Sequence, residues 1–289
     1  MAYDNHRRSA IRDNNDGNAM TNKLTLHDDP ISGNGYKVRL LLGFLGINYE
    51  YVRYDILKAE TRTETFLQRL NANGRIPVLE LEDGTPVAES NAILCYLADG
   101  TPWWPSDRLA RARTLQWMFF EQYSHEPNIA TLRFWTHLTL LTPAQEAARD
   151  GKVSQGYAAL NLMDTQLTKN SWLVGEGPTV ADISLYAYTH VAHEGGFDMA
   201  PYSAIHAWFR RIEAQPGYVS MTIKSFADYS DGRNFSDTPL IQYRSPVGSG
   251  PSGNTCPRCP SQRAQCTSVR VMKNPLSTSS SIASGSLGA

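Results

Sequence analysis

Three short segments in the first third of the chain combine residue types that could hold and activate a small ligand. The first, residues 32–35, reads Ser-Gly-Asn-Gly directly before a helical pattern. Ser32 and Asn34 are common cap and turn residues, so a purely structural role is one interpretation. A functional role is the other, because a hydroxyl, a carboxamide and free backbone N–H groups at a helix N-terminus stabilise an anion.

The second segment, residues 73–77, reads Asn-Gly-Arg-Ile-Pro. Pro77 can begin an edge strand without removing a ladder donor, which is the simpler interpretation. If the bond before Pro77 is cis, the backbone of Ile76 turns outward and can pair with an extended, peptide-like ligand. On that interpretation the segment contributes backbone hydrogen bonds to a binding site.

The third segment is the pair Glu89 and Ser90, which precedes another helical pattern. Ser90 suits a helix N-terminus, where backbone N–H groups attract a carboxylate. Glu89 beside it offers a carboxylate to an ammonium group. The pair therefore matches both charges of an amino-acid terminus.

The elements that must position these segments follow the order β-α-β-α-β-β-α. Val38, Leu41, Leu42 and Leu45 repeat at helical spacing, with Lys37 and Arg39 on the opposite side of the helix and Gly46 at its C-terminal cap. Alternating, aromatic and branched residues mark the strands. We predict a mixed sheet flanked by helices, with the three segments at one end of it. The predicted elements cover residues 24–27, 38–45, 49–54, 61–70, 77–81, 85–88 and 90–99.

The remaining chain is divided by its composition. Residues 100–106 are rich in helix breakers and read as a linker between domain 23–99 and domain 107–224. The second domain lacks strand patterns and is predicted to be a helical bundle. Polar residues 1–22 are expected to be a disordered leader, and residues 225–289 a disordered, low-complexity tail. The predicted helices of the bundle cover residues 108–123, 143–168, 180–192 and 203–215.

Composition excludes several classes of partner. Lysine plus arginine total 27 and aspartate plus glutamate 28, so the net charge of −1 provides no field for nucleic acid or an anionic bilayer. Hydrophobic residues make up 41% of the chain, which is enough for two cores, yet no apolar run reaches the length of a membrane span. With no secretory pattern at the start and Cys95 alone in the folded part, we expect a soluble, cytoplasmic protein.

Two motifs in the tail are interpreted as fortuitous. Residues 248–253 match G-x-G-x-x-G as a string, but neither the strand nor the helix that gives this fingerprint its function is predicted there. Cys256 and Cys259 have the spacing of a metal or redox pair, yet only Cys266 lies nearby and no histidine follows. No metal is therefore expected.

Taken together, the three segments resemble the ligand-binding segments of the glutathione S-transferase family. The resemblance covers residues 23–221 and includes the helix-cap sequence Thr-Val-Ala-Asp at residues 179–182. It implies a thioredoxin-like N-terminal domain followed by an all-helical domain, glutathione as co-substrate, a role in detoxification and a homodimer.

The resemblance also implies a role for each candidate site residue. Ile76 would pair its backbone with the cysteinyl part of glutathione, with Pro77 cis, while Glu89 and Ser90 would hold the γ-glutamyl end. Ser32 occupies the catalytic position, with Asn34 as the neighbouring candidate. Two further residues are matched loosely to the glycine carboxylate, because a guanidinium suits a carboxylate in two-point contact: Arg62 and Arg75.

The chemistry that follows is activation of a thiol. A thiol of ordinary pKa is only about 3% ionised at pH 7, and the thiolate is the nucleophile. Ser32 is expected to donate a hydrogen bond to the glutathione sulfur, with Asn34 or a backbone N–H as second donor. The thiolate then attacks a small hydrophobic electrophile between the domains. Most of the nearby aromatic residues are expected in the core, with two or three lining an apolar pocket: Trp117, Phe119, Phe120, Tyr123, Phe134 and Trp135.

Two alternatives remain open on the same fold. The activated thiol of glutathione could instead reduce disulfides or peroxides, or isomerise an unsaturated acid. The loop holds no cysteine, which argues against a mixed disulfide between protein and glutathione there. The other alternative is a non-catalytic module that binds glutathione or another protein, as family relatives in translation complexes do.

Overall fold

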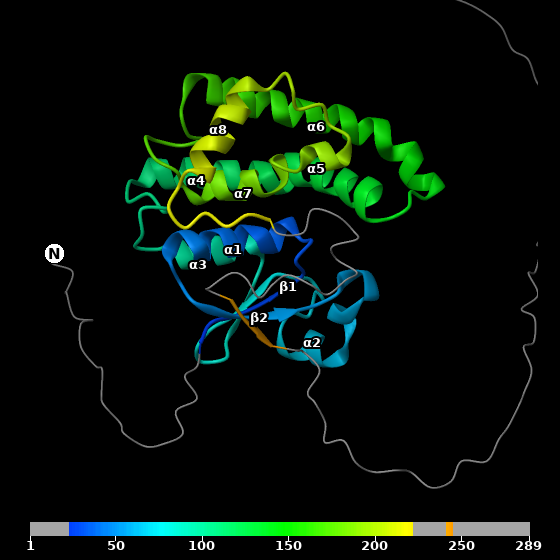
Figure 1. Ribbon diagram of the computed structural model, residues 1–289, viewed down its shortest axis with the longest axis vertical. Coiled ribbons are helices and arrows are strands. Elements are labelled where there is room, and N and C mark those ends of the chain that lie inside the picture. The colour runs from blue at the N-terminus through cyan, green and yellow to red at the C-terminus, as the bar shows by residue number, and fades with distance from the viewer. Residues whose placement is uncertain (1–22, 222–240, 245–289) are drawn as a thin grey trace, which may run out of the picture. The chain divides into compact units, whose positions relative to one another are not determined.

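The computed structural model describes residues 23–221 and 241–244, which form a five-stranded mixed sheet and a set of helices (Figure 1). The strand order is β4-β3-β1-β2-β5. Strand β1 runs parallel to β2 and antiparallel to β3, and β3 pairs antiparallel with β4. The first domain thus has the mixed sheet and the β-α-β-α-β-β-α order of a thioredoxin-like domain, which confirms the fold prediction.

The elements of this domain lie close to their predicted positions. The helix predicted over residues 61–70 is shorter, because 3-10 turns at Ile56–Lys58 and Glu60–Arg62 come before it and Thr63 caps the helix proper. The observed bounds are β1 Thr25–Asp28, α1 Gly33–Leu45, β2 Tyr49–Arg53, α2 Glu64–Arg69, β3 Val78–Glu80, β4 Pro86–Ala88 and α3 Ser90–Ala98.

Helix α1 lies at the centre of the protein, between the sheet and the helical domain (Figure 1). Its predicted apolar residues Val38, Leu41 and Leu42 are fully buried, and Gly46 ends it in the left-handed region with φ 64°. Lys37 and Arg39 are buried as well: Lys37 pairs with Glu121 of the second domain, and Arg39 pairs with Asp28 of β1. Buried cations require partners, so this helix carries polar contacts into the interior.

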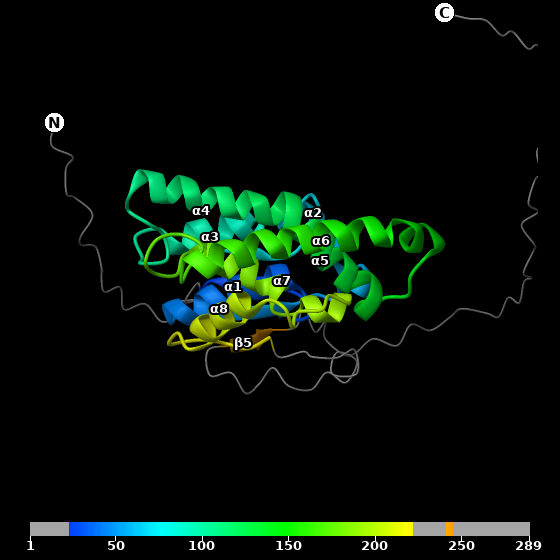
Figure 2. The ribbon, with the colours of Figure 1, turned by 90° about the horizontal axis from the view of Figure 1, so that it is seen from above.

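The second domain is all-helical, as predicted, and helix α6 packs against α5 and α8 (Figure 2). Helix α5 was not predicted, because Pro127 interrupts the pattern. In the structure Pro127 lies in the first turn, where no backbone N–H is required. The π-helical segments Glu121–His125 and Phe134–Leu138 flank α5. The helices are α4 Arg108–Phe120, α5 Glu126–Arg133, α6 Pro143–Lys169, α7 Val180–Thr189 and α8 Ser203–Glu213.

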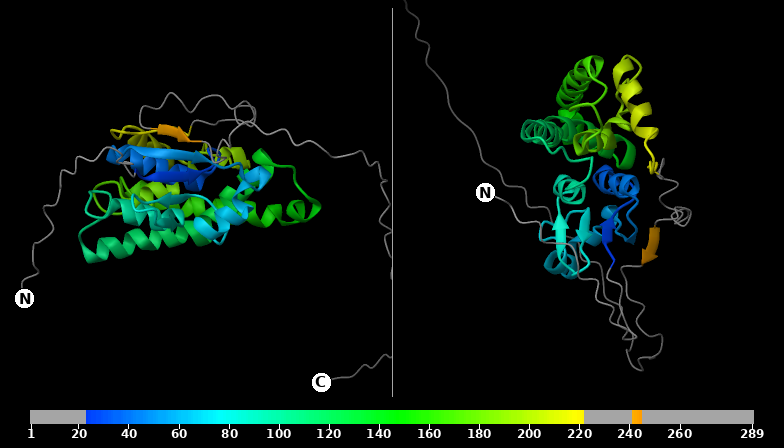
Figure 3. Two further views of the ribbon diagram at one scale, coloured as in Figure 1. Left: turned by 90° about the horizontal axis from the view of Figure 1, so that it is seen from below. Right: turned by 90° about the vertical axis from the view of Figure 1, so that its left-hand side faces the viewer.

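The structure describes residues 241–244 within the segment 225–289 that is expected to be a disordered tail. These residues form strand β5, Ile241–Arg244, which pairs parallel with β2 at the edge of the sheet (Figure 3, orange). An edge strand presents unpaired N–H and C=O groups, and any extended segment that reaches it can pair there without a core of its own. The strand depends on its hydrogen bonds to β2, so the low-complexity composition around it gave no sign of it.

Ending the chain at residue 224 removes β5 and tests how much the sheet depends on it. We expect the two domains to stay folded, because β1 to β4 and the helices pack without β5, with a loss in the free energy of unfolding of about 1 to 2 kcal/mol. Amide hydrogen exchange should accelerate in Tyr49–Arg53. Exchange in β2 that matches the full chain would show that β5 does not pair in solution.

Other predictions fall on residues that the structure does not describe. These are the leader 1–22, the glycine string at 248–253 and Cys256, Cys259 and Cys266. Within residues 23–221 and 241–244, no group of histidine, cysteine and acidic residues could hold a metal ion. Over the same part of the chain, every helix is too short or too polar to cross a bilayer.

Candidate functional site

Strand register brings the three predicted segments to the same end of the sheet. His27 of β1 is opposite Val78 of β3, and Val78 is opposite Ala88 of β4. The loop after β1, the turn before β3 and the loop after β4 therefore meet at this end. They lead into α1, β3 and α3, so both helices direct their N-termini to the site.

Ser32 is the N-cap of helix α1. Its Oγ accepts a hydrogen bond from the Gly35 N–H at 3.2 Å, and no residue that the structure describes accepts the hydroxyl proton. A serine hydroxyl carries one donor hydrogen and two acceptor positions. Ser32 thus serves as a helix cap and still has a hydrogen to donate to a ligand, so the two interpretations of this residue are compatible.

The turn before β3 has the conformation that the resemblance implies. The Ile76–Pro77 peptide bond is cis. Arg62 lies behind the turn, where its Nη1 donates to the Asn73 carbonyl at 2.9 Å. A side chain at Gly74, whose φ is 62°, would meet Arg62 Nη1 at 2.7 Å. Arg62 is therefore engaged with the backbone of the turn, while Arg75 is exposed.

Glu89 and Ser90 differ sharply in environment. Glu89 is exposed and holds φ 71°, ψ 110°, which an L-residue rarely adopts and which costs about 1 to 3 kcal/mol. No side chain caps α3, so its first backbone N–H groups are open to an anion. Ser90 is buried, and its Oγ donates to Asn34 Oδ1 at 3.1 Å. The start of α3 is therefore strained and leaves backbone N–H groups available to an anion.

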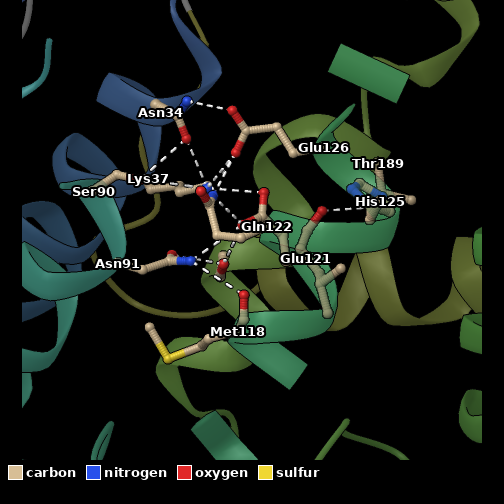
Figure 4. A network of polar contacts seen from close by, with 12 residues as sticks. Asn34, Lys37, Ser90, Asn91, Met118, Glu121, Gln122, His125, Glu126 and Thr189 are labelled. Atoms are coloured by element: carbon tan, nitrogen blue, oxygen red, sulfur yellow. Dashed lines mark hydrogen bonds and ion pairs between the residues drawn. The ribbon is translucent and has the colours of Figure 1, made fainter. Parts of the chain in front are cut away.

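Asn34 belongs to a polar network that joins the two domains (Figure 4). Its Oδ1 accepts from Lys37 Nζ at 2.8 Å and from Ser90, and its Nδ2 donates to Glu126 Oε1 at 2.7 Å. These contacts orient the carboxamide from both sides and leave one Nδ2 hydrogen for another acceptor. Asn34 thus connects Ser90 of the first domain to α5 of the second.

Lys37 is the centre of this network. Its Nζ is 2.9 Å from Glu121 Oε1 and 3.6 Å from Glu126 Oε2, and the side chains of Lys37 and Glu121 are wholly buried. Burial raises the pKa of Glu126, against the lowering effect of Lys37. No local pattern points to Lys37, Glu121 or Glu126, because the contacting residues are 84 and 92 positions apart in the chain. A lysine one turn after the Ser-Gly-Asn-Gly loop was the available clue.

The six aromatic residues that were expected near the space between the domains are divided between core and surface. Three of the six pack against the core: Trp117, Phe120 and Trp135. The Trp117 and Phe120 rings pack edge to face, with their centroids 5.3 Å apart. The expectation that most of the six are core residues is wrong, because α4 and each of the two π-helical segments have one aromatic side chain exposed. The exposed fractions are 67% for Phe119, 88% for Tyr123 and 37% for Phe134.

His125 is buried next to this network. Its Nε2 is 2.9 Å from Thr189 Oγ1, and Thr189 donates its own hydrogen to the Leu185 carbonyl, so His125 is the donor. Burial and the charge of Lys37 lower the pKa of His125 to about 3. His125 is therefore neutral near pH 7 and contributes to packing. His137 lies elsewhere, 3.7 Å from Glu194.

The lowered pKa of His125 predicts an acid-labile fold. Between pH 6.5 and pH 3, His125 binds a proton in the unfolded chain but not in the folded chain. The free energy of unfolding that is present above pH 6.5 is therefore lost as the pH falls toward 3. Relative to His125→Gln, which keeps a donor for Thr189, the wild type should lose about 1.4 kcal/mol per pH unit. Urea unfolding at pH 7.5, 6 and 5 measures this.

The comparison with His125→Gln is needed because another group shifts in the opposite sense. Burial raises the pKa of Asp28 to about 7, which favours folding as the pH falls. Asp28 is present in both proteins, so its effect cancels in the difference. Equal pH dependence in the two proteins would show that His125 titrates normally in the fold.

Comparison with known proteins gives consistent matches. A family model described as the glutathione S-transferase N-terminal domain matches residues 22–99, and its C-terminal counterpart matches residues 124–216. The crystal structure of a glutathione S-transferase from Pseudomonas fluorescens is 49% identical, with a TM-score of 0.65, and the match covers 69% of this chain and 99% of that one.

Two further matches have other names. Disulfide-bond oxidoreductase YfcG of Escherichia coli is 28% identical over 199 residues, which is 66% of this chain and 91% of that protein. Ure2p in complex with glutathione is 22% identical with a TM-score of 0.62, over 69% of this chain and 92% of that one. At the latter identity the likeness concerns the fold.

Proposed function

Because the chain belongs to the glutathione S-transferase family, we propose that it is an enzyme that activates glutathione for attack on a small hydrophobic electrophile. Glutathione is the co-substrate, and no metal takes part in the reaction. The thiol loses its proton to solvent, the thiolate sulfur forms a bond to the electrophilic carbon, and the leaving group departs with its electron pair.

The observation that carries the proposal is the state of Ser32. Its hydroxyl accepts from Gly35 and keeps its hydrogen for a ligand, at the N-terminus of a helix of 13 residues. A hydrogen bond to a charged acceptor contributes about 1.5 to 3 kcal/mol and a helix N-terminus about 0.3 to 1 kcal/mol. Together they are sufficient to lower a thiol pKa by about one to three units. Asn34 supplies its remaining Nδ2 hydrogen as a second donor.

The other segments hold the tripeptide in place. The backbone of Ile76 before cis-Pro77 pairs with the cysteinyl residue. The uncapped start of α3 at Ser90 receives the γ-glutamyl carboxylate, and Glu89 receives its ammonium group. Arg62 and Arg75 serve the glycine carboxylate; Arg75 is the freer of the two, because Arg62 is bound to the Asn73 carbonyl.

The pKa of bound glutathione tests the proposal. Thiolate absorbance of the complex, followed against pH, is expected to titrate one to three units below free glutathione, about 8.5. Transfer to an aryl halide should follow the same titration. An unshifted pKa with tight binding would refute catalysis and support the non-catalytic module.

Disulfide reduction is the second candidate, favoured by the match to the Escherichia coli oxidoreductase. The glutathione thiolate would attack one sulfur of a disulfide, form a mixed disulfide and release the other sulfur as a thiolate. A second glutathione would then resolve the mixed disulfide. Product analysis with an aryl halide and with a small dialkyl disulfide separates the two reactions.

A homodimer completes the proposal. Large apolar side chains are exposed on α3 and along the end of α4, namely Tyr96, Phe119 and Tyr123. A second copy of the chain would cover these side chains, since aromatic residues are enriched at protein–protein interfaces. Sedimentation velocity on the protein, with Phe119→Asp as the disrupting variant, tests the dimer.

A further inference from the structure

The peptide group that leads into Ser32 is held on both of its sides. The Ser32 N–H donates to the Asp29 carbonyl at 2.9 Å. The carbonyl of the same peptide group, that of Ile31, accepts from Arg133 Nη1 at 2.8 Å. The first contact lies within the loop, whereas the second comes from helix α5 of the other domain.

Arg133 is itself fixed by a second anchor. Its side chain is 3% exposed, and its Nε donates to the Glu194 carboxylate. Glu194 is held in turn, because its N–H donates to the Val191 carbonyl at 3.0 Å. Close packing at Gly195, where a side chain would meet the Arg133 backbone nitrogen at 3.0 Å, leaves this arrangement little freedom.

Apolar packing supports the same loop from the same domain. The Ile31 side chain is buried with Leu138, which follows Arg133 by five residues. The Tyr188 ring lies where a side chain on Gly33 would be, 2.4 Å from the position of its Cβ. The helical domain therefore packs against the residues on both sides of Ser32, Ile31 and Gly33.

From this geometry we infer that Arg133 is a positioning residue for the Ser32 hydroxyl, acting across the domain boundary through the Ile31 carbonyl. The inference deepens the proposed function and rests on it. Arg133 and Glu194 neutralise each other, so the pair supplies orientation without a net charge. A guanidinium can bridge Glu194 and the Ile31 carbonyl at once because its N–H donors form a rigid, planar fork.

Arg133→Lys and Arg133→Met test the inference. Lysine keeps the positive charge but lacks the planar fork of donors, and methionine lacks both. Both variants are therefore expected to raise the pKa of bound glutathione by about one unit and to lower kcat about tenfold below pH 7. The KM for glutathione should change less than threefold, because no proposed tripeptide contact is removed. Arg149→Met is the control; Arg149 lies on α6 and pairs only with Glu146 at 3.8 Å among the described residues.

Each outcome decides between specific alternatives. If Arg133→Lys keeps the wild-type pKa while Arg133→Met raises it, Arg133 acts through its charge and the positioning role is refuted. If both keep the wild-type pKa, Arg133 has no effect on the thiol and the inference fails alone. A wild type that leaves the glutathione pKa unshifted would refute the proposed function as well. Arg133→Lys decides the matter by itself if Arg133→Met does not fold.

Discussion

Replacing Ser32 by alanine is expected to raise the pKa of bound glutathione by about one to two units and to lower turnover of an aryl halide at pH 6.5 by about 10- to 100-fold. The variant removes the hydroxyl that has a hydrogen available for the sulfur. Binding of glutathione should weaken far less, because the proposed contacts of Ile76, Glu89 and Ser90 with other parts of the tripeptide remain. Thiolate absorbance against pH and steady-state kinetics measure the two effects separately.

Two further variants show whether the hydroxyl itself is responsible. Ser32→Thr keeps a donor and an N-cap, so it should retain most of the pKa shift. Asn34→Ala should reduce the shift less than Ser32→Ala, because only one Nδ2 hydrogen of Asn34 is available. Full activity in Ser32→Ala together with lost activity in Asn34→Ala would reverse the assignment of the donor.

Replacing Asp182 by alanine should cause the largest loss of stability of any single change considered for this chain. The Asp182 carboxylate is wholly buried and accepts from the Leu173 N–H at 3.0 Å, the Thr179 N–H at 2.8 Å and Trp208 Nε1 at 2.9 Å. The Thr179 hydroxyl is a fourth donor at 3.2 Å. Burial raises the pKa of Asp182, and these hydrogen bonds oppose that rise.

Alanine would leave all four donors buried without an acceptor. Each unsatisfied donor costs about 1 to 3 kcal/mol, partly recovered by relaxation, so the free energy of unfolding should fall by about 3 to 5 kcal/mol. Asp182→Asn keeps one acceptor oxygen and should lose about half as much. Urea unfolding of the three proteins is the measurement. A loss below about 1 kcal/mol in Asp182→Ala would mean that water replaces the carboxylate.

The Asp182 and Ser32 predictions concern different parts of the molecule. Asp182 closes the capping box of α7 with Thr179 and ties that helix to α8 through Trp208. Its loss should reduce the amount of folded enzyme while leaving the pKa of glutathione bound to the folded fraction unchanged. Ser32→Ala should do the reverse, so the two variants serve as controls for each other.

Much of the fold was predictable because its determinants are local. Ser32, Gly46 and the Thr179 capping box mark helix ends through contacts within four residues. Pro77 and the alternating strands placed the hairpin for the same reason. The three candidate segments could likewise be picked out, since each consists of neighbouring residues whose types suit one part of an amino-acid or peptide ligand.

Prediction was wrong or incomplete where a local feature has two readings. Pro127 interrupts a helical pattern in the sequence, yet it begins α5 in the structure. Residues 241–244 offer no core, yet the open edge of β2 gives them hydrogen bonds. Phe119 and Tyr123 look like core residues by type, but their exposure depends on which side of α4 and the following turn meets the other helices.

The sequence by itself determined which groups are present for chemistry: a hydroxyl and a carboxamide at one helix start, a proline that exposes backbone, and an acidic residue beside a serine. Only the tertiary structure decided how those groups are held. Asn34 is hydrogen-bonded to Glu126, which is 92 residues away in the chain, and Lys37 to Glu121, which is 84 residues away. The Ile31 carbonyl accepts from Arg133, which is 102 residues away. Polar side chains accept whichever partner packing brings to them, and packing between domains depends on surfaces that no local spacing encodes.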